Sequence, residues 1–247
     1  MTRRLKAVEL FLAVGLIAGV TACGNTSTPE VETGAAPDAA AEVAEGGEGG
    51  EGADYSAGEQ ANADFQDKLS GAELLSALQA GGHVIYFRHA QTETDYADQA
   101  DPDMSLDDCE TQRKLSQEGL EQAEEIGASF TAQEIPVGEV ITSEYCRAWQ
   151  TADLAFGTYE KNADLNFLPF EDYTDEQVEE MKANVMPFLT EVPAEGTNTV
   201  IVGHDDIFEA ATGIYPDPQG IAYVLTPDGN GSFTLQANML PEAWGEL

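Results

Sequence analysis

Three apolar segments that each lead to basic or histidine side chains limit the possible folds more than any other feature of this chain. The segments are 83–87, followed by Arg88 and His89; 140–142, followed by Arg147; and 199–203, followed by His204 and Asp205. Each segment has the length and apolar content of a buried β-strand. Side chains that follow the strands of a parallel sheet meet at one edge, where such sheets bind their ligands. We therefore expect these residues to surround one site.

Helical patterns separate the predicted strands. Capping-box sequences at 70–73 and 174–177 each predict a helix start. Ser116 precedes an apolar stripe of Leu120, Ala123, Ile126 and Phe130, and a helix over 146–156 is expected to stop at Gly157. The alternation predicts an α/β three-layer sandwich, with a mainly parallel central sheet flanked by helices on both faces. The turn-rich residues 227–231, between 221–226 and 232–236, predict an antiparallel edge hairpin near the C-terminus.

The first 22 residues resemble a lipoprotein signal peptide. Arg3, Arg4 and Lys6 precede an apolar stretch that is too short for a comfortable membrane span. The sequence 20–23 resembles a lipobox, in which Cys23 is lipidated. The alternative is an ordinary signal peptide that happens to contain a cysteine. The first interpretation predicts an exported, membrane-anchored lipoprotein on the cell envelope or periplasmic face.

Composition divides the remainder of the chain into two regions. Residues 23–64 are acidic and rich in Gly and Ala, and they cannot bury enough apolar surface to fold, so we expect a disordered tether. Residues 65–247 have the pattern of a catalytic domain.

Negative charge dominates the chain. Lys and Arg number 10 against 46 Asp and Glu, which gives a formal net charge of −36. Nucleic-acid binding is not expected, because it needs a basic footprint. Contact with a membrane is expected only through the N-terminal lipid. The acids are interpreted as a solvated, salt-adapted surface rather than as a recognition surface.

Cys109 and Cys146 are expected to form a disulfide, because export places the chain in an oxidising compartment and lipidation of Cys23 leaves an even number of cysteines. The alternative is two buried free thiols. Neither cysteine has a second ligand at metal spacing, so no metal is expected.

The predicted site fits phosphoryl transfer. A neutral His89 imidazole can attack a phosphomonoester and form a phosphohistidine that water hydrolyses. Arg88 and Arg147 would bind phosphate bidentately, and His204 would complete the clamp. Each of these residues, taken singly, could be an ordinary structural residue. His83, the third histidine, is expected to have a structural role at the entry of its strand.

Four motifs in this order resemble the histidine phosphatase superfamily, which has the phosphoglycerate mutase-like fold. They are 88–92 (Arg-His-Ala-Gln-Thr, with Ala90 in the usual Gly position), 115–123, 143–152 and 202–205. The resemblance covers about residues 80–225. It implies that His89 is the nucleophile and that Arg88, Arg147 and His204 form the phosphate pocket, with Thr92 of the first motif also binding substrate. It implies no metal and no cofactor.

Asp205 departs from the phosphoglycerate mutase branch, which has glycine at this position. The acid phosphatase branch has His-Asp here, so Asp205 is the first candidate for the general acid. Glu171 and Asp172 are the other candidates. Alternatively, Asp205 only caps the helix that follows His204.

The resulting hypothesis is an exported, lipid-anchored phosphatase that acts on a phosphorylated small molecule. One alternative is a surface lipoprotein that binds a phosphorylated ligand without turnover. Another is a phosphomutase, against which export argues.

Overall fold

The computed structural model describes residues 56–94, 104–168 and 173–247. The predicted signal peptide, Cys23, residues 23–55 of the predicted tether, and the candidate acids Glu171 and Asp172 lie outside the described residues. Within the described ranges, the structure contains no helix with the length and hydrophobicity needed to cross a membrane.

A six-stranded sheet with the order β3-β2-β4-β1-β5-β6 forms the centre of the domain. The strands are β1 (Val84–Arg88), β2 (Val137–Thr142), β3 (Glu160–Lys161), β4 (Asn198–Gly203), β5 (Ala222–Pro227) and β6 (Phe233–Met239). Strands β3, β2, β4 and β1 run parallel. Strand β5 is antiparallel to β1 and to β6. The predicted fold class is confirmed, including the antiparallel hairpin at the edge.

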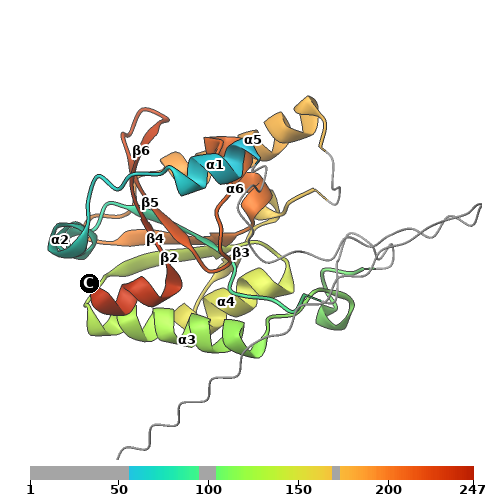
Figure 1. The fold of residues 1–247 in the computed structure, drawn as a ribbon, viewed down its shortest axis with the longest axis horizontal. Helices are drawn as coiled ribbons and strands as arrows, with labels where there is room; N and C mark the ends of the chain where they lie inside the picture. Colours follow the sequence, from blue (N-terminus) through green and yellow to red (C-terminus); the bar gives the residue numbers. More distant parts are fainter. Residues whose placement is uncertain (1–55, 95–103, 169–172) are drawn as a thin grey trace, which may run out of the picture. The chain divides into compact units, whose positions relative to one another are not determined.

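Helices cover both faces of this sheet (Figure 1). On one face lie α3 (Gln117–Ala132), α4 (Cys146–Phe156) and the 3-10 helix η4 (Pro241–Glu246). On the other lie α1 (Ala57–Ala63), α5 (Asp175–Thr190) and α6 (Asp205–Thr212). Each face has its own apolar core. Ile126, Phe130 and Trp244 are buried in the first, and Met181, Val185 and Phe208 in the second.

The helix starts follow the sequence signals with one exception. Thr174 and Gln177 form the predicted capping box of α5, and the Ser116 hydroxyl accepts a hydrogen bond from the Gly119 amide at the start of α3. Helix α4 ends at Gly157, whose φ of 75° needs the left-handed region that glycine adopts without strain. At α2 (Gly71–Ala80), Ser70 precedes the helix, but its side chain makes no capping hydrogen bond to the described residues.

The predicted boundary between tether and domain at residue 64 is wrong. Residues Ala57–Ala63 form α1, which opens with a capping box between Ser56 and Glu59. The side-chain oxygen of Asn62, Oδ1, accepts a hydrogen bond from the Tyr223 hydroxyl, and the backbone amide of Tyr215 donates to the carbonyl of Gly58. Composition did not indicate this helix because its few apolar contacts are with residues distant in sequence.

Candidate active site

The parallel register brings the ends of β1, β4 and β2 side by side. Arg88 pairs with Gly203, and the His89 amide donates to the Gly203 carbonyl at 3.0 Å. The Ser143 amide donates to the Val202 carbonyl, also at 3.0 Å. Gly203 is required here because a Cβ would meet the Tyr86 hydroxyl at 2.3 Å. That hydroxyl donates to the His204 carbonyl at 2.6 Å and so holds the chain as it leaves β4.

His89 is fully buried with both ring nitrogens in contact with polar groups. Its Nδ1 lies 2.8 Å from the Ala90 carbonyl oxygen, which can only accept, so Nδ1 carries the hydrogen. Its Nε2 therefore holds a lone pair, which accepts from Arg147 Nε at 3.0 Å. Burial, together with the charges of Arg147 and Arg88, holds the pKa of His89 well below 6.5. The imidazole is neutral and nucleophilic at Nε2.

Arg147 is buried in the first turn of α4. Its guanidinium lies over the rings of Tyr145 and Phe167, at 5.0 Å and 5.2 Å from the ring centroids. The Thr151 hydroxyl donates to the Arg147 carbonyl at 2.7 Å and accepts from the Ala90 amide at 3.0 Å. This threonine connects the helix that carries Arg147 to the segment that carries His89.

His204 lies 5.4 Å from His89, measured between ring centroids, and Tyr145 and Phe167 contact its ring edge to face. Its Nε2 is 2.9 Å from the Ser143 hydroxyl oxygen, whereas its buried Nδ1 has no hydrogen-bond partner among the described residues. Burial and the charges of Arg147, Arg113 and Arg88 hold its pKa well below 6.5. A hydrogen-bond donor would satisfy this buried polar atom, and an oxyanion would do so once Nδ1 carries a proton.

Arg88 is buried but is bound mainly by acidic groups. Its guanidinium contacts Asp205 at 2.5 Å and Asp217 at 3.0 Å, and it donates to the Pro216 carbonyl at 2.9 Å. Burial raises the pKa of Asp205, but the Arg88 charge and the Tyr215 hydroxyl more than offset this and leave it below 3.8. Asp205 is therefore ionised at neutral pH, which opposes its predicted role as a proton donor. The alternative role as helix cap is not observed either, because His204 occupies the N-cap position of α6.

The adjacent carboxyl behaves in the opposite way. Burial and the Asp205 charge raise the pKa of Asp206 to about 7. No local pattern in the sequence indicates that two consecutive aspartates would differ, because Asp205 owes its lowered pKa to Arg88 and Tyr215, which are distant in sequence.

Thr92 lies close to the site, and its polar groups are occupied by a neighbouring side chain. Its amide and its hydroxyl both donate to Gln219 Oε1, at 2.8 Å and 3.2 Å. The preceding residue, Gln91, packs against α3 so closely that a Cβ on Gly119 would meet the Gln91 carbonyl oxygen at 1.9 Å. The absence of a side chain at Gly119 therefore allows the segment after His89 to pack directly against α3.

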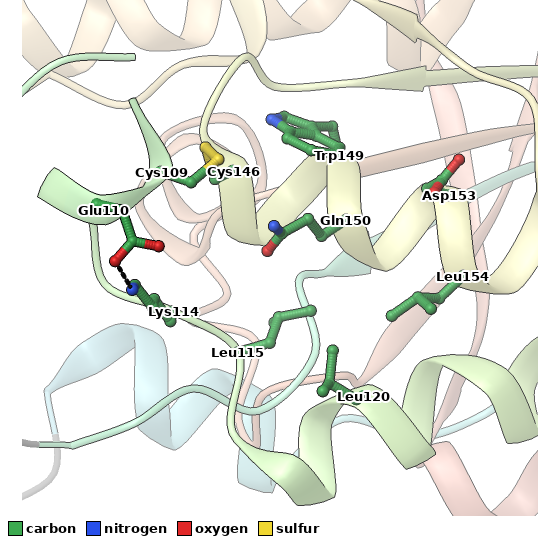
Figure 2. A pocket seen from close by; sticks show the side chains of 10 residues that line it. All are labelled: Cys109, Glu110, Lys114, Leu115, Leu120, Cys146, Trp149, Gln150, Asp153 and Leu154. Carbon is green, nitrogen blue, oxygen red and sulfur yellow. Dashed lines mark hydrogen bonds and ion pairs between the residues drawn. A yellow bond between two sulfur atoms is a disulfide. The ribbon is translucent and has the colours of Figure 1, made fainter. Parts of the chain in front are cut away.

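Cys109 and Cys146 are joined by a disulfide, the pair that the even cysteine count indicated. The bridge connects the 3-10 helix η2 (Cys109–Thr111) to the first residue of α4, next to Arg147. Both cysteines line a groove of about 410 Å³ between η2, α3 and α4. Figure 2 shows its other side chains, among them Trp149, Leu115, Leu120 and the Lys114–Glu110 ion pair.

Several residues around the histidines have no functional signal of their own in the sequence. Ser143 belongs to one of the four motifs but had no predicted role, and Asn166, Asp217 and Gln219 had no signal because their partners are distant in sequence. In the three described ranges, no group of three or more His, Cys, Asp or Glu side chains could hold a metal ion.

Comparison with known proteins gives a family match. Residues 84–169 match the histidine phosphatase superfamily (branch 1). A search of curated proteins gave no match. The predicted family resemblance is confirmed, and phosphatase or mutase activity is the activity of this family.

Matches among solved structures include three phosphatase-related proteins. The protein histidine phosphatase SixA complexed with tungstate is 16% identical with a TM-score of 0.46, over 64% of this chain and 97% of that chain. An Entamoeba histolytica phosphoserine phosphatase mutant in complex with phosphoserine is 12% identical with a TM-score of 0.45. The match covers 65% of this chain and 98% of that chain. A phosphohistidine phosphatase SixA from Agrobacterium tumefaciens, an assignment given as provisional, is 20% identical with a TM-score of 0.41, over 65% and 99%.

Proposed function

We propose that this chain, a member of the histidine phosphatase superfamily, hydrolyses a phosphomonoester through a phosphohistidine intermediate on His89. The observation that carries the proposal is the pair formed by His89 and Arg147. The ring is neutral and Nδ1–H is held by the Ala90 carbonyl, so the Nε2 lone pair points toward a buried guanidinium. A nucleophile beside a fixed positive charge is the arrangement that phosphoryl transfer needs.

In the first step, His89 Nε2 attacks phosphorus, the N–P bond forms and the bond from phosphorus to the ester oxygen breaks. Arg147 would exchange its bond to Nε2 for bonds to phosphoryl oxygens, and His204 would face the same group. A proton donor must protonate the leaving alcohol. In the second step, water attacks phosphorus, the N–P bond breaks, and a proton of the water returns to the group that protonated the alcohol. Inorganic phosphate leaves, and His89 is neutral again.

We also propose that the chain is exported and lipid-anchored at Cys23. The support is the sequence of residues 1–23 together with the disulfide of the domain, since such bridges persist in oxidising compartments. Metabolic labelling with a fatty acid would place the lipid. We expect incorporation into the wild type and none into Cys23→Ser.

Hydrolysis of p-nitrophenyl phosphate tests the catalytic proposal. We expect His89→Ala to lower kcat by at least about 10³-fold because the nucleophile is lost. The matched control is His83→Gln, because His83 is buried at the entry of β1 and bonds to the Thr226 hydroxyl rather than to the site. We expect this control to keep its activity within a few-fold.

Rapid quenching with labelled substrate should trap an acid-labile phosphohistidine in the wild type and in His83→Gln, but not in His89→Ala. Binding of the ester without phosphate release would contradict hydrolysis and indicate a binding protein. Return of the label to an acceptor alcohol would indicate a mutase.

A further inference from the structure

We propose that Ser143, Asn166 and Glu144 form a positioning relay that fixes the tautomer of His204, with the result that oxyanion binding takes up one proton. The proposal rests on the proposed phosphoryl site. It adds three positioning residues that act through His204.

The orientation of the Asn166 amide is determined by its two neighbours from Glu144. The Glu144 backbone amide, which can only donate, lies 2.9 Å from Asn166 Oδ1. The Glu144 carboxylate, which can only accept, lies 2.9 Å from Asn166 Nδ2. Rotating the amide by 180° would place donor against donor and acceptor against acceptor, so Oδ1 is the atom that faces Ser143.

The single hydroxyl hydrogen of Ser143 therefore has only one destination. Asn166 Oδ1 lies 2.7 Å from Ser143 Oγ and can only accept, so the hydroxyl donates to it. The lone pairs of Ser143 Oγ then face two donors, the Tyr145 amide at 3.2 Å and His204 Nε2 at 2.9 Å. His204 Nε2 must carry a hydrogen, because two acceptors at this distance would repel each other.

The Nδ1 atom of neutral His204 is consequently a lone pair, buried and without a hydrogen-bond partner in the described part of the chain. A fully deprotonated oxyanion offers only lone pairs as well. The two can form a hydrogen bond only when one proton is added to His204, which makes the ring an imidazolium that donates from both nitrogens. Binding an oxyanion at this position therefore takes up one proton.

The charged groups around His204 set the conditions of a test. Arg147, Arg113 and Arg88 oppose the imidazolium until an anion arrives, and His89 is neutral. The acids nearest to His204 along the relay and on the following helix are Glu144, at the far end of the relay, and Asp205 and Asp206, in the first turn of α6. Since the pKa of Asp206 is about 7, this carboxyl is mostly ionised between pH 8 and pH 9.

Tungstate is a suitable probe because it is tetrahedral and stays fully deprotonated over this pH range. Calorimetric titration of the protein with sodium tungstate, in two buffers of different ionisation enthalpy, counts the protons taken up. We expect about one proton per tungstate, and a roughly tenfold rise in Kd from pH 8 to pH 9. Proton uptake near zero in the wild type would overturn the proposal.

Variants of the relay should separate tautomer control from simple packing. Ser143→Ala removes the acceptor, and Asn166→Ala lets the Ser143 hydroxyl turn and donate to Nε2. In both variants neutral His204 can carry its hydrogen on Nδ1, so we expect proton uptake to fall toward zero and the pH dependence of Kd to flatten. Glu144→Gln keeps every hydrogen bond but removes the charge. We expect it to keep the uptake of about one proton and to bind tungstate several-fold more weakly.

The control is Glu124→Gln, which removes one exposed acid on α3. It should leave the proton uptake and the Kd for tungstate unchanged. If the Ser143 and Asn166 variants both take up a full proton, the relay is rejected. Nitrogen-15 NMR of the imidazole reports the tautomer directly, and an Nδ1–H form of His204 in the free wild type would also reject it. These readouts need no turnover, so inactivity on every phosphomonoester would refute the proposed function and leave the relay intact.

Discussion

At the scale of single residues, the two arginines predicted to hold phosphate have different surroundings. Arg147 lies between aromatic rings and contacts His89, whereas Arg88 is bound by Asp205 and Asp217. The ion pair keeps Asp205 ionised, so its carboxylate acts on Arg88 rather than on the leaving group.

We therefore expect Asp205→Asn to slow hydrolysis of an alkyl phosphate and of p-nitrophenyl phosphate by similar factors. A general acid matters far more for the poor alkoxide leaving group than for p-nitrophenolate. Steady-state kcat/KM on the two esters is the measurement. A loss that is at least about tenfold larger on the alkyl ester would restore Asp205 as the proton donor.

Asp206 gives a pH-dependent prediction for stability. Its folded-state pKa of about 7 lies above its ordinary value of 3.8, so the folded state binds more protons than the unfolded state between these values. The free energy of unfolding therefore falls as the pH rises through this window. Asp206→Asn cannot ionise, so relative to wild type it should gain about 3 kcal/mol between pH 4.5 and pH 8.

Urea unfolding at the two pH values measures this difference. An equal change in both proteins would show that Asp206 does not carry the effect. The expected gain is below the full effect of the pKa shift because the unfolded-state carboxyl is already mostly ionised at pH 4.5.

At the scale of elements, the position of α4 depends on the disulfide at its first residue. The bridge between Cys109 and Cys146 closes a loop of 37 residues in the unfolded chain. Cys109→Ser combined with Cys146→Ser should lower the free energy of unfolding by about 3 kcal/mol. It should also lower kcat/KM, because Arg147 follows the bridge directly.

Thermal unfolding with and without reductant tests the stability effect. Reductant should lower the melting temperature of the wild type and leave the double variant unchanged. If reductant leaves the melting temperature of both the wild type and the double variant unchanged, the bridge does not contribute to stability in solution.

At the scale of the whole molecule, the proposed phosphate site belongs to a chain with a formal net charge of −36. The substrate is repelled at long range and held at short range, so added salt should speed capture by screening the repulsion. Raising NaCl from about 10 mM to about 300 mM, which shortens the Debye length from roughly 30 Å to below 10 Å, should raise kcat/KM several-fold and leave kcat nearly constant. A steady fall of kcat/KM with salt would contradict this field effect.

The sequence alone determined the layers, the order along the chain of the strands other than β3, and the convergence of His89, Arg147 and His204. These follow from local pattern, because apolar periodicity defines each element and parallel strands carry the residues after them to one edge. Helix α4 matched its predicted bounds, and Gly157 is the local signal for its C-terminal end.

Only the tertiary structure decided what each of these side chains contacts. Helix α1, the Asp205–Arg88 pair and the contact from Asn166 through Ser143 to His204 join residues that are distant in sequence, and their partners depend on packing at a scale of a few ångströms. Charge states follow from those contacts, since burial and one neighbouring guanidinium separate the pKa of Asp205 from that of Asp206. The residue types were visible in the sequence, but their protonation depends on distances that only the folded chain sets.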